Sequence, residues 1–310
     1  MSLSFGDVAF VIPALNEEAL IGGTISSIKN YAPGAKIIVI DNGSVDETRD
    51  IARKMGVEVF VAVNVTVGAM RNIGVNKTNS EVVVFLDADV SLTKEWALEM
   101  LDVLKFYSRS ERIITGSHCS PPPGENWFLK YWFSSFALER DVNHIGTGHM
   151  LLSRTAFNDI GGFDESLITG EDYDFCQRAK SRGYKIKNNT DLKVYHYDFP
   201  VTVGAFIKRE AWHGIGDVGS LSGVFASKVA IAALLFIFLH VLAISAALFS
   251  GTSVLVFCVL MIVVLCVLSS IKKNTHADLL TKLCNSILFY FYYCGRAMSF
   301  LKRAAFCKRF

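Results

Sequence analysis

Two aspartates one residue apart, Asp87 and Asp89, directly follow the apolar run of residues 82–86. The run is rich in β-branched residues and apolar on both faces, which is typical of a central strand in a parallel sheet. Open α/β sheets bind their ligands beyond the carboxyl ends of such strands. Two carboxylates there would suit Mg²⁺ or Mn²⁺, ions that commonly serve the phosphates of a substrate. A solvated turn is the alternative, because aspartate is common in turns.

Polar clusters also follow two earlier strand-like runs, residues 8–12 and 36–40. Helical patterns over residues 20–31 and 46–55 separate the runs from one another. Alternating strands and helices predict an α/β fold with a doubly wound, mostly parallel sheet and right-handed crossovers. All the clusters would then lie along one edge of that sheet. They are Pro13-Ala14-Leu15-Asn16-Glu17-Glu18 and Asp41-Asn42-Gly43-Ser44.

The crevice at this edge does not have the sequence of an ordinary dinucleotide site. The turn after the first strand lacks Gly-x-Gly-x-x-Gly, and the chain contains no Gly-x-x-x-x-Gly-Lys-Ser/Thr loop. These patterns disfavour an NAD enzyme or a P-loop NTPase and favour a metal-assisted nucleotide site.

Ser44 and Glu47 have the spacing of a capping box, which predicts the start of the second helix.

Several segments resemble, in the same order, the motifs of family-two inverting glycosyltransferases of the GT-A fold. The resemblance extends over about residues 7–200, and the ordered set is specific although each motif alone is weak. Asn42 departs from the pattern, because many members carry a second aspartate there, and Asp41 is left as the implied base contact. The matching segments are residues 11–18, 41–48, 68–74, 85–89, 161–165 and 170–179.

The resemblance implies a role for each candidate site residue. Asp89 would ligate the metal, and Asp87 would face the ribose or the same ion. Asp172 would be the catalytic base that takes the proton of the acceptor hydroxyl, with Asp174 as its rival if the register differs. Residues 146–150 resemble an acceptor-side turn. The nucleotide would be bound by Pro13, Asn16, Glu17, Asp41 and Arg71.

His196 ends another apolar, strand-like segment, and related enzymes often bring a histidine from this region to the metal. Imidazole binds Mn²⁺ better than Mg²⁺, whereas the structural alternative for a lone histidine is a hydrogen bond within the core. The expected cofactor is therefore Mn²⁺ or Mg²⁺, and the expected donor is a nucleotide diphosphate sugar. The net charge of +2 gives no support for a nucleic-acid partner.

The sequence changes character after residue 221. Residues 229–249 and 253–271 are almost wholly apolar, and each run is long enough to span a bilayer. Basic residues flank the pair, Lys228 before it and Lys272 after it, which predicts a hairpin with both ends on the cytoplasmic side. The hydrophobic content of 51% agrees with a membrane protein.

A third apolar stretch, about residues 279–301, contains charged residues and predicts an interfacial or re-entrant helix. We therefore expect a cytoplasmic GT-A catalytic domain over residues 1–221 and a membrane domain over residues 222–310. The N-terminus has no signal-peptide pattern. The seven cysteines show no Cys-x-x-Cys pairing, which indicates reduced thiols rather than a disulfide framework.

Two further segments could contact lipid. Residues 124–143 carry aromatic side chains at the spacing of an amphipathic helix, which fits either a core helix or an interfacial one. A basic and aromatic segment containing Arg209, Trp212 and His213 precedes the apolar half. It fits a juxtamembrane anchor somewhat better than a contact with the donor pyrophosphate.

Together these patterns indicate a membrane-anchored, metal-dependent inverting glycosyltransferase. It would move one sugar at a time to a lipid-linked or glycan acceptor, because the Gln-x-x-Arg-Trp motif of processive synthases is absent. A nucleotidyltransferase is an alternative enzyme class, but it should show a basic, Gly-rich signature near the first strand. A catalytically inactive membrane scaffold is the alternative outside enzymes, and the intact Asp87, Asp89 and Asp172 argue against it.

Overall fold

The chain divides into two compact units in the computed structural model, which describes residues 3–107, 112–124, 126–133, 142–275 and 277–306. The first unit comprises Met1–Pro123 with Phe136–Asp198, and the second comprises Gly124–Ser135 with Phe199–Phe310. These limits differ from the boundary expected at residue 221. The division into a catalytic domain and a membrane domain stays a prediction.

Seven strands of the first unit form one mixed sheet: β1 (Val8–Ala14), β2 (Lys36–Asp41), β3 (Glu58–Val61), β4 (Val82–Leu86), β6 (Ile113–Gly116), β7 (His149–Ser153) and β8 (Lys185–Asn188). Their order is β3-β2-β1-β4-β7-β6-β8. The first four strands are parallel, whereas β7 is antiparallel to both of its neighbours. The mostly parallel α/β sheet that the sequence predicts is confirmed.

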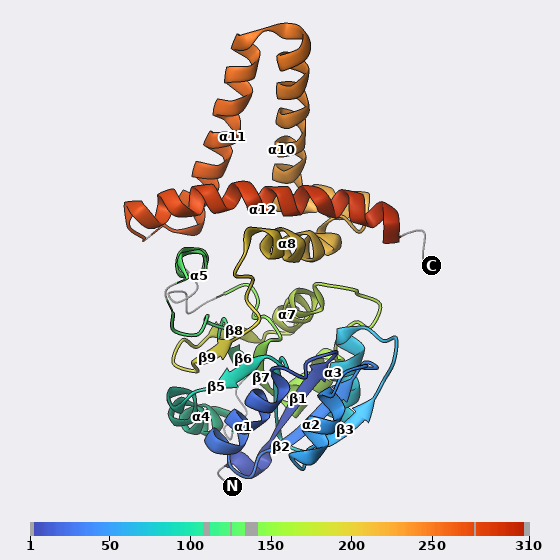
Figure 1. Ribbon diagram of the computed structural model, residues 1–310. Coiled ribbons are helices and arrows are strands. Elements are labelled where there is room, and N and C mark those ends of the chain that lie inside the picture. The colour runs from blue at the N-terminus through green and yellow to red at the C-terminus, as the bar shows by residue number, and fades with distance from the viewer. Residues whose placement is uncertain (1–2, 108–111, 125, 134–141, 276, 307–310) are drawn as a thin grey trace. The chain divides into compact units, whose positions relative to one another are not determined.

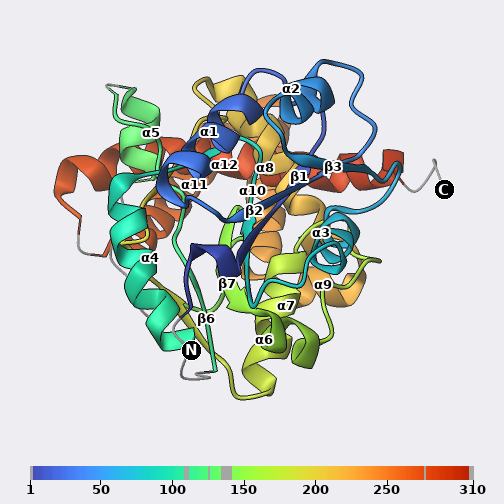
Figure 2. The same cartoon turned by 90° about the horizontal axis from the view of Figure 1, so that it is seen from below.

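Helices cover both faces of this sheet. Figure 2 shows α1 and α4 on one side and α3, α6 and α7 on the other. A separate two-stranded sheet pairs β5 (Val90–Leu92) with β9 (Val194–His196) in antiparallel register. The helices are α1 (Ile21–Tyr31), α2 (Thr48–Lys54), α3 (Val67–Asn76), α4 (Lys94–Tyr107), α6 (Arg154–Ile160) and α7 (Glu171–Ser181).

The alternation of side chains along β1 joins the sheet to both helical layers. Phe10 and Ile12 are fully buried in the cluster that contains Trp96 of α4. Val11, which points the other way, is buried in the cluster that contains Phe175 of α7. Because every β1 residue is buried, the strand reads as a continuous apolar run rather than an alternating one.

The capping box predicted for Ser44 and Glu47 is wrong. α2 begins at Thr48, and the side chain of its N-cap residue, Glu47, makes no capping hydrogen bond. The hydroxyl of Ser44 instead accepts the backbone N–H of Asn16 at 2.9 Å, and Asp46 accepts the N–H of Thr48 at 3.1 Å. The Ser44 side chain thus connects the turns that follow β1 and β2.

The second unit is helical throughout its named elements. Two of its helical segments, Lys228–Phe249 and Thr252–Lys273, are long and apolar enough to cross a membrane, with mean hydropathies of 2.7 and 3.2. α10 and α11 lie side by side as a hairpin, and α12 lies across its base (Figure 1). The helices are α5 (Trp127–Trp132), α8 (Val203–Asp217), α9 (Leu221–Ala226), α10 (Lys228–Ser245), α11 (Thr252–Lys273) and α12 (Leu279–Phe306).

We expect a helix over the aromatic stretch of residues 124–143, and within that stretch α5 is helical over Trp127–Trp132. Residues 134–141 lie outside the described part of the chain. Phe128 and Trp132 are buried, and both pack edge-on against Phe206 of α8 with ring centroids 4.8 and 4.9 Å apart. These contacts give the two rings the core role that was one of the two interpretations of the stretch.

α8 and α12 pack closely because small residues lie between them. A Cβ atom added to Gly214 of α8 would overlap the side chain of Ser299 of α12, with the two Cβ atoms 2.9 Å apart. Arg296 of α12 pairs with Glu210 and Asp217 of α8 at 3.1 and 3.0 Å. The mostly buried guanidinium of Arg296 thus has two carboxylate partners on the facing helix.

Replacing Gly214 with alanine should therefore destabilise the second unit. We expect Gly214→Ala to lower the free energy of unfolding by about 1–3 kcal/mol, the usual range for overpacking, measured by thermal unfolding in detergent. Gly204→Ala on the same helix is the control, because a Cβ there would meet nothing within 4 Å. Equal changes in the two variants would contradict the close α8–α12 contact.

Candidate active site

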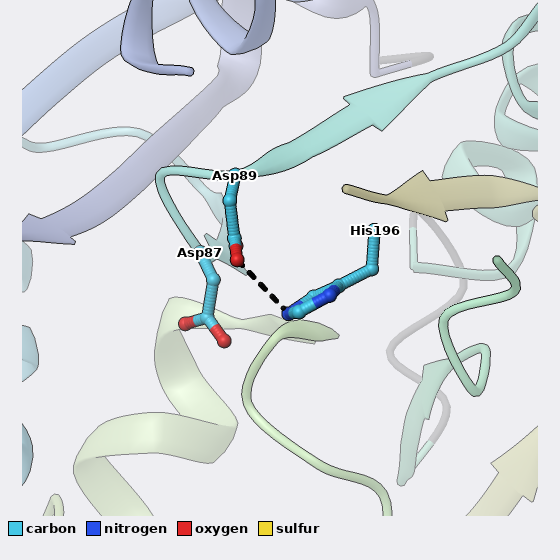
Figure 3. A group of neighbouring side chains, drawn as sticks. All are labelled: Asp87, Asp89 and His196. Atoms are coloured by element: carbon cyan, nitrogen blue, oxygen red, sulfur yellow. Dashed lines mark ion pairs between the residues drawn. The ribbon is translucent and has the colours of Figure 1, made fainter. Parts of the chain in front are cut away.

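Asp87, Asp89 and His196 come together at the carboxyl end of β4, as Figure 3 shows. Each side chain offers one ligand atom, and these atoms lie within 4.8 Å of one another. Asp89 Oδ2 is 3.1 Å from His196 Nε2. The pairing of β5 with β9 places the histidine, because Val90 is in register with His196. The local sheet thus brings together residues that are distant in the sequence.

Negative charge accumulates around this cluster. Burial, with contributions from the neighbouring carboxylates of Asp87 and Glu17, raises the pKa of Asp89 to about 7. Burial likewise raises the pKa of Glu17 to about 7, with contributions from Asp198 and Asp87. Two oxygen ligands and one imidazole fit Mn²⁺, and a divalent cation would relieve the repulsion that raises these pKa values.

Arg71 supplies positive charge to this region from α3. Its side chain is 3% exposed, and its two terminal nitrogens donate to different carboxylates. Nη2 is 3.0 Å from Asp87 Oδ1, and Nη1 is 2.8 Å from Glu171 Oε1. Thr147 donates a second hydrogen bond to the same Glu171 oxygen at 3.2 Å. The structure therefore places Arg71 between Asp87 and the first residue of α7.

Asp41 lies at the carboxyl end of β2 and is completely buried. Its Oδ2 accepts the backbone N–H groups of Gly43 and Ser44, both at 3.0 Å. Gly43 adopts a positive φ of 86°, which lets this tight turn close on the carboxylate. Within the described residues, Oδ1 of Asp41 is buried without a hydrogen-bond partner. That oxygen is an acceptor that a ligand N–H could satisfy.

Two other residues that the sequence predicts to contact the nucleotide, Pro13 and Asn16, have structural roles in the backbone. Pro13 is buried within β1, in register with Ile40 of β2. Asn16 has a left-handed φ of 56°, and its side-chain oxygen accepts the N–H of Val45 at 2.9 Å. Both residues therefore shape the turns beside Asp41.

The two candidate bases have different surroundings. Asp174 forms an ion pair with Arg178 one turn later on α7, with a Nη2–Oδ2 distance of 2.7 Å. Asp172 accepts the N–H of Tyr173 at 2.7 Å through Oδ1, and its Oδ2 would lie 3.6 Å from a Cβ atom added to Gly146. The Asp172 carboxylate thus faces the turn before β7, while Asp174 is held on its own helix.

A support for the cluster of Asp87, Asp89 and His196 that the sequence motifs did not reveal lies next to Asp87. The backbone N–H of Asp87 donates to Gly148 O at 3.2 Å, and a Cβ on Gly148 would lie 2.9 Å from Asp87 Oδ2. The adjacent His149 is fully buried and accepts from Trp96 Nε1 at 2.8 Å. Burial lowers the pKa of His149 to about 3, so the ring is neutral and structural.

Arg209, Trp212 and His213 lie on α8 in the second unit, whereas Asp87, Asp89, His196 and Asp172 belong to the first. The exposed indole of Trp212 packs against the His213 ring, with a centroid distance of 5.2 Å. Their expected role as an anchor or a donor contact stays a prediction.

Known proteins resemble this chain in sequence. Glycosyl transferase family 2 matches residues 9–161, and the N-terminal domain of galactosyltransferase matches residues 129–198. The pre-mycofactocin glycosyltransferase of Mycobacterium tuberculosis is 26% identical over 226 residues, which are 68% of this chain and 47% of that protein. The chain therefore spans about half the length of this curated relative.

Two other relatives match shorter parts. The dolichyl-phosphate hexose transferase of Haloferax volcanii is 29% identical over 189 residues, which are 59% of this chain and 81% of that protein. The 4,4'-diaponeurosporenoate glycosyltransferase of Staphylococcus haemolyticus is 33% identical over 114 residues, which are 34% of this chain and 29% of that protein.

The fold also resembles a solved structure. The mannosyltransferase PcManGT from Pyrobaculum calidifontis, in complex with GDP-Man and Mn²⁺, superposes with a TM-score of 0.61 and 14% sequence identity. The match covers 96% of this chain and 88% of that chain. With the family match over residues 9–161 and the mixed sheet of the first unit, this likeness leads to one conclusion: the chain carries a glycosyl transferase family 2 domain with the GT-A fold.

Proposed function

We propose that this protein is a metal-dependent, inverting glycosyltransferase that moves one sugar from a nucleotide diphosphate sugar to a lipid-linked or glycan acceptor. The observation that carries the proposal is the group formed by Asp87, Asp89 and His196, whose ligand atoms lie within 4.8 Å of one another. The group lies at the carboxyl end of a central strand in a family 2 domain. The family match favours this class over a nucleotidyltransferase.

Asp89 and His196 are the proposed ligands of Mn²⁺ or Mg²⁺, and Asp87 completes the group. When bound, the ion would offset the charge on the departing nucleoside diphosphate. The raised pKa values of Asp89 and Glu17 support a cation here, because they reflect buried carboxylates that repel one another. The imidazole favours Mn²⁺ over Mg²⁺.

The nucleoside end of the donor would lie against the turns after β1 and β2. Asp41 offers a buried oxygen that lacks a partner among the described residues, and a base or ribose donor could satisfy it. Glu17, in the turn after β1, is near enough to Asp46 and Asp87 for their charges to act on it, and its carboxylate could bind a ribose hydroxyl. Pro13 and Asn16 would contribute by shaping the backbone, since their own groups serve the fold.

Asp172 is the proposed catalytic base. Inverting transfer is a single displacement at the anomeric carbon, so the acceptor hydroxyl must lose its proton as it attacks. Asp172 keeps Oδ2 near the Gly146 turn, whereas the Asp174 carboxylate is paired with Arg178. This difference favours Asp172 over its rival, and a positioned carboxylate of this kind typically accelerates transfer by about 10²–10⁴-fold.

The proposed location of the protein is the membrane, and one proposed class of acceptor is a lipid-linked sugar or phosphate. The two apolar helices would span the membrane as a hairpin, with the catalytic domain on the cytoplasmic side, because lysines flank the hairpin. One relative is named as a dolichyl-phosphate hexose transferase, which favours a lipid-linked acceptor. α12 would lie in the interface, since it exposes a helical stripe of Leu279, Leu283, Ile287, Tyr290, Met298 and Leu301.

Loss of the proposed metal ligand should abolish transfer without unfolding the protein. Residues that hydrogen-bond to metal ligands typically contribute about 10–100-fold to metal affinity or activity. Asp89→Asn removes a ligand itself, so it should lower activity by about 100-fold or more. Donor-sugar hydrolysis by the detergent-purified protein is the measurement, with EDTA expected to inhibit and Mn²⁺ or Mg²⁺ to restore it. Asp50→Asn, at an exposed carboxylate of α2, is the control. Full activity in chelator would refute the metal assignment.

Substitution of the proposed base should affect transfer and spare donor binding. Asp172→Asn keeps the size of the side chain and removes its basicity, so the transfer rate should fall by about 10²-fold or more. Nucleotide-sugar binding, measured by calorimetry, should change little. Asp174→Asn is the matched variant on the same helix. A near-normal Asp172 variant beside an inactive Asp174 variant would move the base to Asp174.

The hairpin topology can be tested by thiol labelling. In a background without reactive native thiols, cysteines introduced at positions 2 and 310 should react with a membrane-impermeant reagent from the same side. Phe249→Cys should react from the opposite side, because position 249 is highly exposed and adjoins the turn between α10 and α11. Labelling of positions 2 and 310 from opposite sides would mean that α12 spans the membrane.

A further inference from the structure

Arg71 joins two segments that the proposed reaction uses separately. Its Nη2 donates to Asp87 Oδ1 at 3.0 Å, at the end of β4. Its Nη1 donates to Glu171 Oε1 at 2.8 Å, at the start of α7. One planar guanidinium therefore fixes the distance between these two carboxylates, which a flexible point charge could not do.

Each carboxylate in turn adjoins a group with a proposed role. Asp87 belongs to the metal group with Asp89 and His196. Glu171 immediately precedes Asp172 on the first turn of α7. Glu171 is itself 7% exposed, which leaves little of it for an acceptor to contact. Glu171 accepts hydrogen bonds from Arg71 and Thr147, and both of these side chains are buried.

The burial of Arg71 argues against a direct contact with the donor. The side chain is 3% exposed, and both terminal nitrogens are already hydrogen-bonded to carboxylates. The Phe163 ring lies over the guanidinium, with its centroid 6.0 Å from Cζ. Moving Arg71 onto a phosphate would leave the buried Glu171 carboxylate without its ionic partner, which is costly.

We propose that Arg71 is a positioning residue that fixes the metal-binding carboxylate of Asp87 relative to the start of the helix carrying Asp172. This inference rests on the proposed function and adds a connection between its metal and its base. Glu171 keeps the guanidinium shared between two acids. Without the Glu171 charge, Arg71 would pair with Asp87 alone and oppose binding of a cation there.

Metal affinity gives the first test, in the absence of any sugar donor. Electron paramagnetic resonance would measure Mn²⁺ binding to the full chain. The Mn²⁺ affinity should fall by about 10-fold in Glu171→Gln, as it typically does when a residue that supports a metal ligand is replaced. Glu165→Gln is the matched control. It also removes one carboxylate beside α3, but that carboxylate accepts from Asn72 at 2.9 Å and is exposed.

Unchanged Mn²⁺ affinity in Glu171→Gln would overturn the proposal, and so would an equal loss in Glu165→Gln, which would reveal a general charge effect. If Glu171→Gln does not fold, Thr147→Val replaces it, because it removes only a neutral donor to the same oxygen. That variant should weaken Mn²⁺ binding in the same direction by a smaller factor. No change there would also overturn the proposal.

Transfer kinetics give the second test. Arg71→Lys keeps a positive charge but cannot bridge both acids, so kcat should fall by up to about 100-fold, as for other small misplacements of reacting groups. Arg71→Lys combined with Glu171→Gln should be hardly worse than either alone, because residues that act as a unit are not additive. At saturating Mn²⁺, nucleoside diphosphate affinity should stay nearly unchanged in both single variants.

Two outcomes of the kinetic test would overturn the proposal. Losses that multiply in the double variant would mean that Arg71 and Glu171 act independently. Weaker nucleoside diphosphate binding in Arg71→Lys alone would mean that Arg71 contacts the donor. A wild-type protein that binds Mn²⁺ but neither hydrolyses nor transfers a sugar would refute the proposed function, while the metal titration would still decide the role of Arg71.

Discussion

Repulsion between carboxylates at the buried end of β4 is the constraint on which this site depends. Burial raises the pKa values of Asp89 and Glu17, and the negative charges of neighbouring carboxylates, Asp87 among them, contribute to both shifts. Like charges in such a place persist only if cations share it. Arg71 supplies one positive charge at 3.0 Å from Asp87. A divalent metal ion would supply the rest of the positive charge that these carboxylates need.

The surrounding fold keeps these charges in place through backbone connections. β7 runs antiparallel beside β4 and places Gly148 where a Cβ would collide with Asp87 Oδ2. The small β5–β9 sheet brings His196 next to Asp89. The neutral, buried ring of His149 ties β7 to Trp96 of α4. Strand pairing and buried contacts therefore hold the acidic group of Asp87 and Asp89 in place, as a preorganised site requires.

The fold and the principal acids could be predicted from local patterns. Continuous apolar runs and helical periodicity indicated the parallel sheet, and the Asp87-Ala88-Asp89 triplet indicated the site. The antiparallel course of β7 and the pairing of β5 with β9 could not be predicted in this way, because they depend on contacts between distant segments. For the same reason the sequence did not indicate that Arg71 contacts Asp87 and Glu171, and its contact with a phosphate or a base stays a prediction. Ser44 misled the prediction of a helix cap because its hydroxyl bonds Asn16 instead.

The central claim is that the acidic group is a cation site that serves a nucleoside diphosphate. Linkage makes this claim directly measurable, because two ligands that stabilise each other must do so by the same factor. Calorimetric titration of a nucleoside diphosphate into the purified protein, with and without Mn²⁺, measures that factor. The account predicts at least about a tenfold gain in nucleotide affinity with Mn²⁺, and an equal gain in Mn²⁺ affinity with nucleotide. Nucleotide binding that is the same with and without the metal would contradict it.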